Sequence, residues 1–241
     1  LALCTSNLPS PEIALPGDNF NTVLYTGDGA TTQAITGVGF EPDFLWTKKR
    51  SATGFHALVD SVRGATNYLS SNSTNIEYDD AEYITSLDSD GFTVGVNTVT
   101  NDDTKTFVAW NWKAGGAPTA DNSAGAGAVP TAGSVKIDGS NLGSALAGTI
   151  AATRLSANTE TGFSIASYTG TGSAATIGHG LSEAPTYISV KNLTDTYNWF
   201  YGGPFFTNGW SDWMHWNKTD EQGNNSADAW NSAAPTASVF S

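Results

Sequence analysis

The fold follows from the stretch Tyr25-Thr26-Gly27-Asp28-Gly29, which leads through Pro42 to the run Asp43-Phe44-Leu45-Trp46-Thr47-Lys48, because the chain repeats it once. The second copy opens with Tyr168-Thr169-Gly170-Thr171-Gly172 and closes with Thr186-Tyr187-Ile188-Ser189-Val190-Lys191. A constant spacing of 143 residues separates five anchor pairs, which are Phe20 and Phe163, Tyr25 and Tyr168, Gly27 and Gly170, Pro42 and Pro185, and Lys48 and Lys191. Repetition at a fixed spacing predicts two modules of one design.

The repeated stretch has the two-residue period of a β-strand. In the run 44–48, Leu45 and Thr47 share one face, and Phe44 and Trp46 share the other. The second copy keeps apolar residues opposite Leu45 and Thr47 but has Ser189 in place of Trp46. We therefore expect the Leu45 face to be the constant core and the Trp46 face to be free to vary.

Short apolar runs separated by turns rich in Gly, Ser, Thr and Asn are typical of antiparallel sandwiches. Strands are expected at 21–25, 33–36, 44–48, 55–60, 67–71, 91–96 and 106–113. The last of these alternates strongly, with Phe107 and Ala109 on one face and Trp110 on the other, so it should be a central strand covered on both sides. The predicted fold class is all-β, with two tandem antiparallel β-sandwich modules of jelly-roll or lectin-like type, joined by a linker rich in Gly, Ala and Pro.

The module boundaries follow from composition. An extended N-terminal segment is expected at 1–19, where three prolines occur, and the first sandwich at 20–114. A linker with an irregular segment docked between the modules is expected at 115–160, and the second sandwich at 161–241. The second copy has no counterpart of the 107–113 run, so we expect it to be truncated and the chain to be a segment of something longer.

Charge and cysteine content exclude several function classes. The chain has 10 Lys and Arg against 23 Asp and Glu, a net charge of −13. Phosphate binding requires concentrated Lys and Arg, so no nucleic-acid partner is expected, and an anionic membrane surface is disfavoured. The sequence lacks an apolar run of about 18 residues, so membrane insertion is not expected. Cys4 is the single cysteine, which leaves no internal disulfide and no thiolate-rich metal site.

Catalytic motifs are missing from the sequence. His56, His179 and His215 lie far apart, and no nucleophile elbow, Walker loop or dinucleotide fingerprint occurs. We expect that the protein is not an enzyme, that it has no catalytic residue and that it has no cofactor. The one metal alternative is calcium at Asp88 and Asp90, whose Asp-x-Asp-Gly pattern suits a hard cation, although a solvated hairpin tip is the preferred interpretation.

The most unusual segment is rich in aromatic residues. Trp199, Trp210, Trp213 and Trp216 are four of the eight tryptophans of the chain, and Tyr201 lies among them. Aromatic faces beside Asn and Asp can stack on sugar rings, so these five residues are the candidate glycan site. The competing and preferred interpretation is that they fill a core or a subunit interface.

The chain resembles a repeat found in structural proteins of tailed bacteriophages, especially those of marine and cyanobacterial hosts. The resemblance lies in Gly37-Val38-Gly39-Phe40-Glu41-Pro42-Asp43-Phe44, in Trp110-Asn111-Trp112-Lys113-Ala114-Gly115-Gly116, and in Gly178-His179-Gly180-Leu181 of the second copy. In that family a SPRY-like or concanavalin-like sandwich often precedes a stretch similar to Leu3-Cys4-Thr5-Ser6-Asn7-Leu8-Pro9. The resemblance implies a virion protein on the particle exterior, such as a tail fibre or appendage, and implies no active site.

Four functions are consistent with these observations. The preferred one is a phage appendage module that spaces or presents a host-recognition surface, as a homo-oligomer whose partners are other copies of itself and other virion proteins. The second is a lectin-like module that binds a host surface glycan through the Trp199 to Trp216 region. The third is a capsid decoration protein. The least favoured is a polysaccharide depolymerase, which would need a pair of carboxylates lining a groove.

Overall fold

The computed structural model of the chain describes residues 15–223, 229–231 and 233–241. Most of the extended segment expected at 1–19 lies outside these residues. Its described end forms a single 3-10 turn, η2 (Pro16–Asp18), in which Pro16 supplies a preset backbone angle at the first position. The chain then enters the first strand directly.

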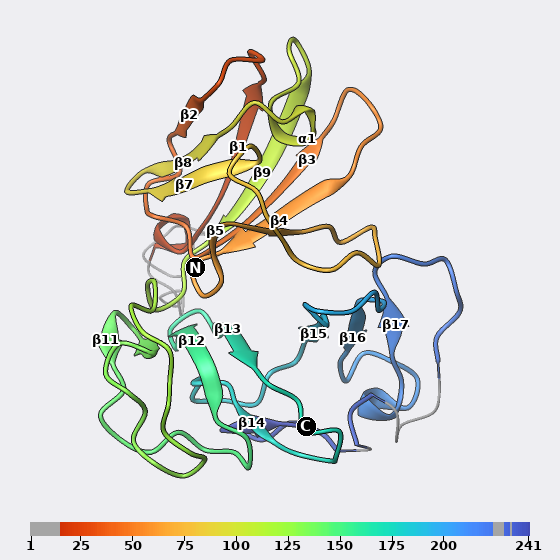
Figure 1. The fold of residues 1–241 in the computed structure, drawn as a ribbon. Helices are drawn as coiled ribbons and strands as arrows, with labels where there is room; N and C mark the ends of the chain where they lie inside the picture. The colour runs from red at the N-terminus through yellow and green to blue at the C-terminus, as the bar shows by residue number, and fades with distance from the viewer. Residues whose placement is uncertain (1–14, 224–228, 232) are drawn as a thin grey trace, which may run out of the picture.

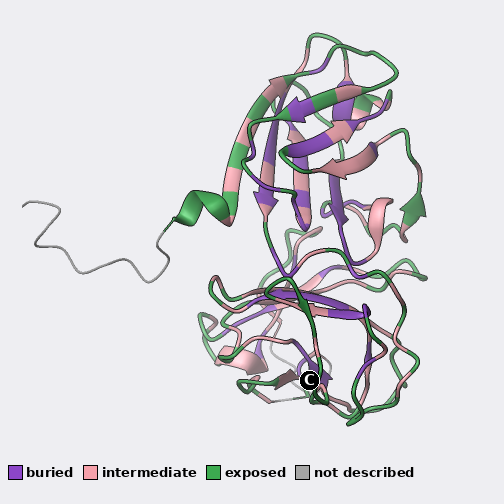
Figure 2. Cartoon of the chain, turned by 90° about the vertical axis from the view of Figure 1, so that its left-hand side faces the viewer, coloured by how far each residue is buried: buried purple, intermediate pink, exposed green. Residues whose placement is uncertain are grey.

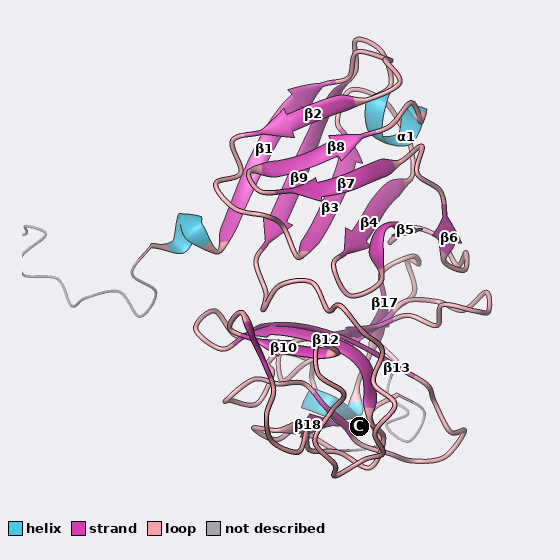
Figure 3. Cartoon of the chain, turned by 60° about the vertical axis from the view of Figure 1, so that its left-hand side comes forward, coloured by secondary structure: helices cyan, strands magenta, loops and turns pink. Residues whose placement is uncertain are grey.

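The first module is a sandwich of two antiparallel sheets (Figures 1 and 3). The six-stranded sheet has the order β1 (Phe20–Thr26), β9 (Thr106–Trp112), β3 (Phe44–Lys49), β4 (His56–Asp60), β5 (Gly64–Leu69) and β6 (Tyr78–Asp79). The three-stranded sheet has the order β2 (Gln33–Thr36), β8 (Gly91–Val94) and β7 (Ile84–Asp88), and one short helix, α1 (Thr98–Asn101), precedes β9. Each of the strands β3 to β5 pairs with the next one in the chain, so β3 to β6 form a meander. This connection differs from the Greek keys that build a jelly roll.

The core of the first module lies between its two sheets. Leu45 of β3, Phe92 of β8 and Ala109 of β9 are fully buried there, and Figure 2 shows buried residues in purple on the strands of this module. Along β3, buried residues alternate with partly buried ones. Thr47 is also buried. The expectation that the Leu45 face is the core is confirmed, because the two-residue period of a strand sends alternate side chains to opposite faces.

The second module repeats part of the strand pairing of the first, with shorter strands. Strands β14 (Ile177–Gly178) and β18 (Val239–Phe240) pair as β2 and β8 do. Strands β15 (Ile188–Val190), β16 (Phe200–Gly202) and β17 (Met214–His215) follow one another as β3, β4 and β5 do. Even the register is kept, because Leu45 pairs with Val59 and Ile188 pairs with Gly202, each 143 residues later. The all-β fold of two tandem modules is therefore confirmed.

The segment predicted as a linker differs from that prediction. Three strands lie within it, β10 (Val135–Ile137), β11 (Ser140–Asn141) and β12 (Ala152–Asn158), and they join β13 (Phe163–Tyr168) in a four-stranded sheet. The side chains of Leu142 and Leu146 pack onto this sheet with Val135 and Leu155, so they belong to the core of the second module and do not lie between the modules. Strand β12 forms because it pairs with β13. The sequence did not predict it, because the small residues of β12 give no strong strand pattern.

Within the described part of the chain, no helix has the length and apolar character needed to cross a membrane.

Candidate functional site

The two modules meet through a cluster of aromatic and leucine side chains, here called the aromatic seam: Trp46, Leu58, Leu69, Trp199 and Trp216. The first three come from the outer face of the six-stranded sheet, and the two tryptophans after them come from the second module. The Trp216 indole stacks with two others, with its ring centroid 5.2 Å from that of Trp46 and 4.8 Å from that of Trp199. Stacked aromatic pairs at these separations stabilise a contact beyond the area that they bury.

Hydrogen bonds fix the position of Trp199 in the aromatic seam. Its indole N–H donates to the carbonyl oxygen of Ser70, across the module boundary, at 2.8 Å. Its backbone N–H donates to the side-chain oxygen of Asn217 at 2.9 Å. The side chain is only 6% exposed, so its apolar area is removed from water while its one polar atom is satisfied.

The aromatic seam explains why the two copies differ at one face. Trp46 points outward from β3 and contacts the second module. Its counterpart Ser189 bonds instead to the carbonyl oxygen of Phe200 in the neighbouring strand, at 3.3 Å. The outer face therefore varies between the copies because only the first copy uses it to bind the second.

A second junction between the modules is polar and is organised by Asp43. This buried carboxylate accepts hydrogen bonds from the Ser61 hydroxyl at 2.6 Å and from the backbone N–H groups of Ala114 at 2.7 Å and Gly116 at 3.1 Å. The Ser156 hydroxyl of β12 accepts from the Gly115 N–H at 2.8 Å and donates to the carbonyl oxygen of Gly116 at 2.9 Å. The chain is thus held where it leaves β9, and this polar junction adds to the contact that the aromatic seam makes between the modules.

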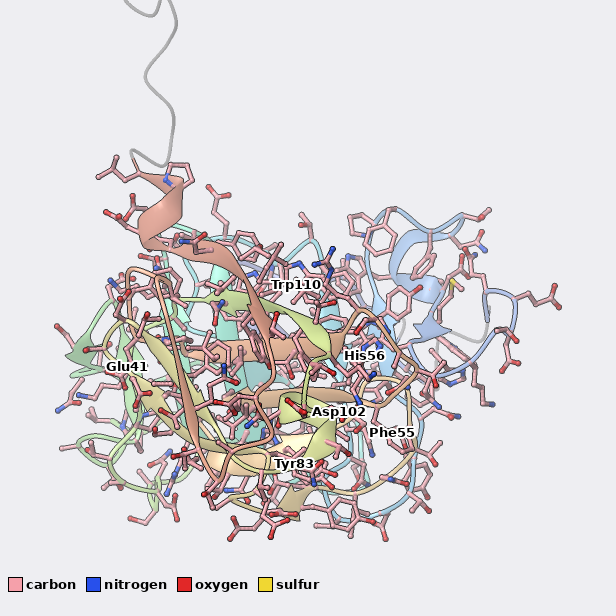
Figure 4. All side chains as sticks on the ribbon, turned by 90° about the horizontal axis from the view of Figure 1, so that it is seen from above. Glu41, Phe55, His56, Tyr83, Asp102 and Trp110 are labelled. Atoms are coloured by element: carbon pink, nitrogen blue, oxygen red, sulfur yellow. The ribbon has the colours of Figure 1, made fainter. Side chains whose placement is uncertain are left out.

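His56 lies beside the aromatic seam at the start of β4, and Figure 4 labels it together with Trp110 of β9. The Trp46 indole nitrogen lies 3.1 Å from His56 Nδ1, and the Ser71 hydroxyl lies 2.9 Å from the same atom. An indole nitrogen can only donate, so Nδ1 is an acceptor and the ring is neutral. Burial, helped by the positive charge of Lys48, lowers the pKa of His56 from its usual value near 6.5 to about 4.

The lowered pKa of His56 predicts that acid weakens the fold. The unfolded chain takes up a proton on this residue as pH falls below about 6.5, whereas the folded chain resists protonation down to about pH 4. The free energy of unfolding should therefore decrease across this window and be unaffected by His56 above it. Urea titrations at pH 4.5 to 7.5 should show this slope, and His56→Gln should show a smaller one. Burial also lowers the pKa of His179 and of His215, so part of the slope should persist in His56→Gln. A slope in His56→Gln equal to that of the parent would contradict the prediction.

An open cleft of about 540 Å³ borders the aromatic seam. One aromatic side chain and five polar or charged ones line it: Asn72, Trp216, Asn217, Lys218, Thr219 and Asp220. Asn72 belongs to the first module and the other five belong to the second. Lys218 and Asp220 form an exposed ion pair, with Nζ and Oδ2 at 3.2 Å, so their charges cancel locally. We call this the Trp216 cleft.

Of the five aromatic residues predicted as a glycan site, only Trp216 lines the Trp216 cleft. Trp199 is buried in the aromatic seam, in agreement with the preferred core or interface interpretation. Trp210 lies edge-on to Trp230, with ring centroids 5.6 Å apart, and Trp213 packs on Phe200 at 5.1 Å.

Tyr201 is the remaining member of the predicted set, and it does not line the Trp216 cleft, although its neighbour Tyr187 accepts a hydrogen bond from the Trp216 indole N–H at 2.6 Å. Its ring stacks with that of Tyr187 at a centroid distance of 5.8 Å. Tyr187 in turn stacks with Phe205 at 6.2 Å, and both Tyr187 and Phe205 are exposed.

The prediction did not include Asn72, which lines the Trp216 cleft from the first module. No signal in the sequence connects Asn72 with Trp216.

The weak calcium candidates lie at the β7–β8 hairpin. The Asp88 carboxylate accepts from the Thr93 hydroxyl at 2.7 Å. The Asp90 carboxylate accepts from the backbone N–H groups of Gly37 at 3.2 Å and Gly39 at 2.7 Å. Asp88 thus stabilises the β7–β8 hairpin itself, and Asp90 stabilises the turn after β2. Among the described residues, no three His, Cys, Asp or Glu side chains are grouped so that they could hold a metal ion.

Comparison with known proteins identifies the repeat as a domain family. A family model described as a domain of unknown function (DUF7483) matches the chain twice, over residues 15–140 and 136–241. The two matches meet at β10 and β11, where the structure begins the second module. No curated protein and no solved structure matches the chain. Because the two matches together span almost all of its length, the chain belongs to the DUF7483 domain family, with two copies in tandem.

Proposed function

We propose that this protein is a binding and spacing module without catalytic activity, whose Trp216 cleft binds a neutral glycan. In the setting that the sequence resemblance implies, the module is part of a tail fibre or another appendage on the exterior of a tailed bacteriophage, and the glycan lies on the host surface. The observation that carries the proposal is the composition of the cleft, which combines one indole with side chains that both donate and accept hydrogen bonds.

The chemistry of the cleft suits a sugar. A pyranose ring offers an apolar face that stacks on an aromatic ring, and hydroxyl groups around its edge that need donors and acceptors. Trp216 is half-buried, and because it stacks with Trp46 and Trp199 it offers the exposed part of its indole ring. The side-chain oxygens of Asn72 and Asn217 accept from the backbone N–H groups of His56 and Trp199, and each amide keeps an N–H that can donate to a sugar hydroxyl. The pairing of Lys218 with Asp220 leaves no uncompensated charge among the lining residues, which favours a neutral sugar over an anionic one.

The construction of the two modules supports a spacing role. The aromatic seam and the Asp43 junction hold the modules in one relative orientation, as an element that transmits force or keeps a distance requires. The Trp216 cleft is built from both modules, so it depends on this orientation. A pre-organised site binds with less entropic cost than one that must be assembled on binding.

Glycan-array screening followed by titration calorimetry tests this proposal. Trp216→Ala should weaken binding of the best glycan at least tenfold, which corresponds to about 1.4 kcal/mol of binding free energy. Trp210→Ala removes an indole outside the cleft and should bind normally.

Because Trp216 also packs in the aromatic seam, a second pair of variants separates binding from folding. Asp220→Ala changes an exposed residue at the cleft, whereas Glu183→Ala changes an exposed acidic residue elsewhere. The first should weaken binding and the second should not, with both proteins as stable as the parent. Full affinity in both Trp216→Ala and Asp220→Ala, or no glycan bound by the folded parent, would rule out the cleft as a glycan site.

A further inference from the structure

The sheet of β15, β16 and β17 has one face toward the core of the second module and one face turned outward. Ile188 has the place in the repeat that the core residue Leu45 has in the first module, so its neighbours in the chain, Tyr187 and Ser189, lie on the outer face. Tyr201 is directly opposite Ser189 in the adjacent strand and therefore lies on the same face.

The corresponding face of the first module is a contact between protein surfaces. Its residues at these three positions, each 143 residues earlier, are Phe44, Trp46 and Leu58. Trp46 and Leu58 belong to the aromatic seam, and the ring of Phe44 lies 6.0 Å from that of Phe163 in the second module. None of the three carries a hydroxyl group, whereas Tyr, Ser and Tyr at the later positions all do. Aromatic area combined with hydroxyl groups suits a ligand that is itself polar.

A third aromatic ring, that of Phe205, extends this face. The Phe205 and Tyr187 rings are nearly parallel, with an interplanar angle of 19°, and their centroids are 6.2 Å apart. Atoms of rings in full face-to-face contact lie about 3.5–4 Å apart, so at this distance the two rings are offset and part of each ring face is left uncovered. Tyr187 is 46% exposed and Phe205 is 59% exposed. We call Tyr187, Ser189, Tyr201 and Phe205 the tyrosine face.

The position of the Phe205 ring depends on a glycine. A Cβ atom on residue 203 would overlap this ring and would lie 2.6 Å from the carbonyl oxygen of Thr186, so Gly203 is needed for the ring to lie there. The exposed ring is thus held against the backbone of its own module. A ring that is already in place loses less conformational freedom when a ligand binds.

A hydrogen bond joins the tyrosine face to the Trp216 cleft. The Trp216 indole N–H donates to the Tyr187 hydroxyl at 2.6 Å, so the two surfaces adjoin. Burial raises the pKa of Tyr187 to about 12, although this hydrogen bond opposes the rise, so the hydroxyl keeps a proton that it can donate. The tyrosine face contains no charged residue, and Lys218 and Asp220 compensate each other in the cleft. The cleft and the face together thus favour an uncharged ligand.

We propose that the Trp216 cleft and the tyrosine face together bind an unbranched neutral oligosaccharide, with Tyr187 and Phe205 contacting the sugar residues that extend beyond the cleft. This inference rests on the proposed binding of a neutral glycan at the cleft and adds the length of that glycan. Each sugar residue of such a chain presents an apolar ring face and hydroxyl groups, so successive residues can use successive aromatic rings. Overall translation and rotation are lost only once, so each further contact adds to the affinity.

Titration calorimetry with oligosaccharides of increasing length tests the inference. The probes are unbranched oligomers of glucose, of mannose and of N-acetylglucosamine, each from the disaccharide to the hexasaccharide. In the series that binds, affinity should rise by about tenfold with length, the size expected for one or two added aromatic contacts. Phe205→Ala should remove most of this gain and leave the affinity for the disaccharide unchanged. Asp220→Ala should weaken the binding of both lengths, because Asp220 lies at the cleft itself.

The possible results separate this inference from the function on which it rests. If no oligosaccharide of any length binds, both fail. If short and long oligosaccharides bind equally, or if Phe205→Ala keeps the full gain with length, only the inference is overturned. Tyr78→Ala is the matched control, because it removes a 43% exposed aromatic ring of β6 that belongs to neither surface, and it should keep the gain. Thermal melting should show all three variants to be as stable as the parent.

Sedimentation equilibrium tests the other possible occupant of the tyrosine face, a second copy of the chain. Phe205→Ala should have the same association state as the parent at every concentration. A dimer of the parent that Phe205→Ala dissociates would show that the face is a contact between protein copies, and this result would overturn the inference.

Discussion

Replacing Arg63 with Met is expected to lower the free energy of unfolding by about 3–5 kcal/mol, since it breaks a buried ion pair and leaves the other partner in place. The guanidinium donates to the Asp60 carboxylate through Nε at 2.6 Å and to the Glu77 carboxylate through Nη1 at 2.8 Å. It also donates to the carbonyl oxygens of Asn67 at 3.0 Å and Leu58 at 3.3 Å. Without it, the charge of Asp60, which is 3% exposed, has no positive partner.

The electrostatics of this group agree with a charged, paired arginine. Burial by itself lowers the pKa of Arg63, but the neighbouring charges of Asp60 and Glu77 outweigh it and raise the pKa above its usual value. The side chain also ties the turn after β4 to the loop that follows β5, since Glu77 lies outside that turn. Its loss should therefore loosen the edge of the six-stranded sheet as well as leave a charge buried.

Urea denaturation measures this effect as a lower midpoint with an unchanged slope. Lys218→Met is the matched control, because it removes an exposed ion pair whose contribution should be no more than about 1 kcal/mol. Arg63→Lys keeps the charge but not the planar fork of donors, so its stability should lie between those of the parent and Arg63→Met. A loss below about 1 kcal/mol in Arg63→Met would show that the buried pair contributes little.

Trp199→Ala is expected to have an effect of similar size at the junction of the modules. Large-to-small changes of buried tryptophan cost about 3–5 kcal/mol, because the cavity left behind adds to the lost apolar burial. Here the change also removes one of the two stacking partners of Trp216 and leaves the Ser70 carbonyl oxygen with only the Ser73 N–H, at 3.3 Å. The aromatic seam is a major contact between the modules, so its loss should separate their unfolding.

Differential scanning calorimetry tests this directly. The parent should unfold in one transition, whereas Trp199→Ala should show two, with a van't Hoff enthalpy smaller than the calorimetric one. Trp199→Phe keeps most of the ring but loses the hydrogen bond, so it should cost about 1–3 kcal/mol and keep one transition. One unshifted transition in Trp199→Ala would mean that the other contacts between the modules, among them the Asp43 junction, are enough to couple their unfolding.

Local pattern was sufficient for much of the first module. The expected strand at 33–36 matches β2 at both ends, and those at 44–48 and 106–113 differ from β3 and β9 by one residue. The inward face of β3 was also predictable, because side chains alternate strictly along a strand and one face must be apolar. Sequence reasoning was less successful between the modules, where β10 is only three residues long and β12 mixes small residues with Arg154 and Leu155, so both owe their conformation to pairing with other strands.

The candidate site was only partly accessible to such reasoning. The aromatic content of 199–216 marked the segment as unusual, but the sequence did not separate a buried indole such as Trp199 from one that lines a cleft such as Trp216. That distinction depends on which residues of the first module face them. Trp46 and Ser70 lie more than 120 residues away in sequence, so their contacts are set by how the sheets pack and not by any local preference.

The sequence by itself determined the all-β class, the two-fold repetition, the inner face of β3 and the acidic, cysteine-poor character, because each depends on composition or on the two-residue period of a strand. Only the tertiary structure decided that the Trp46 face joins the modules and that the Trp216 cleft draws on both of them. These features arise from contacts between residues far apart in the chain, whose free energy depends on the packed arrangement of whole sheets.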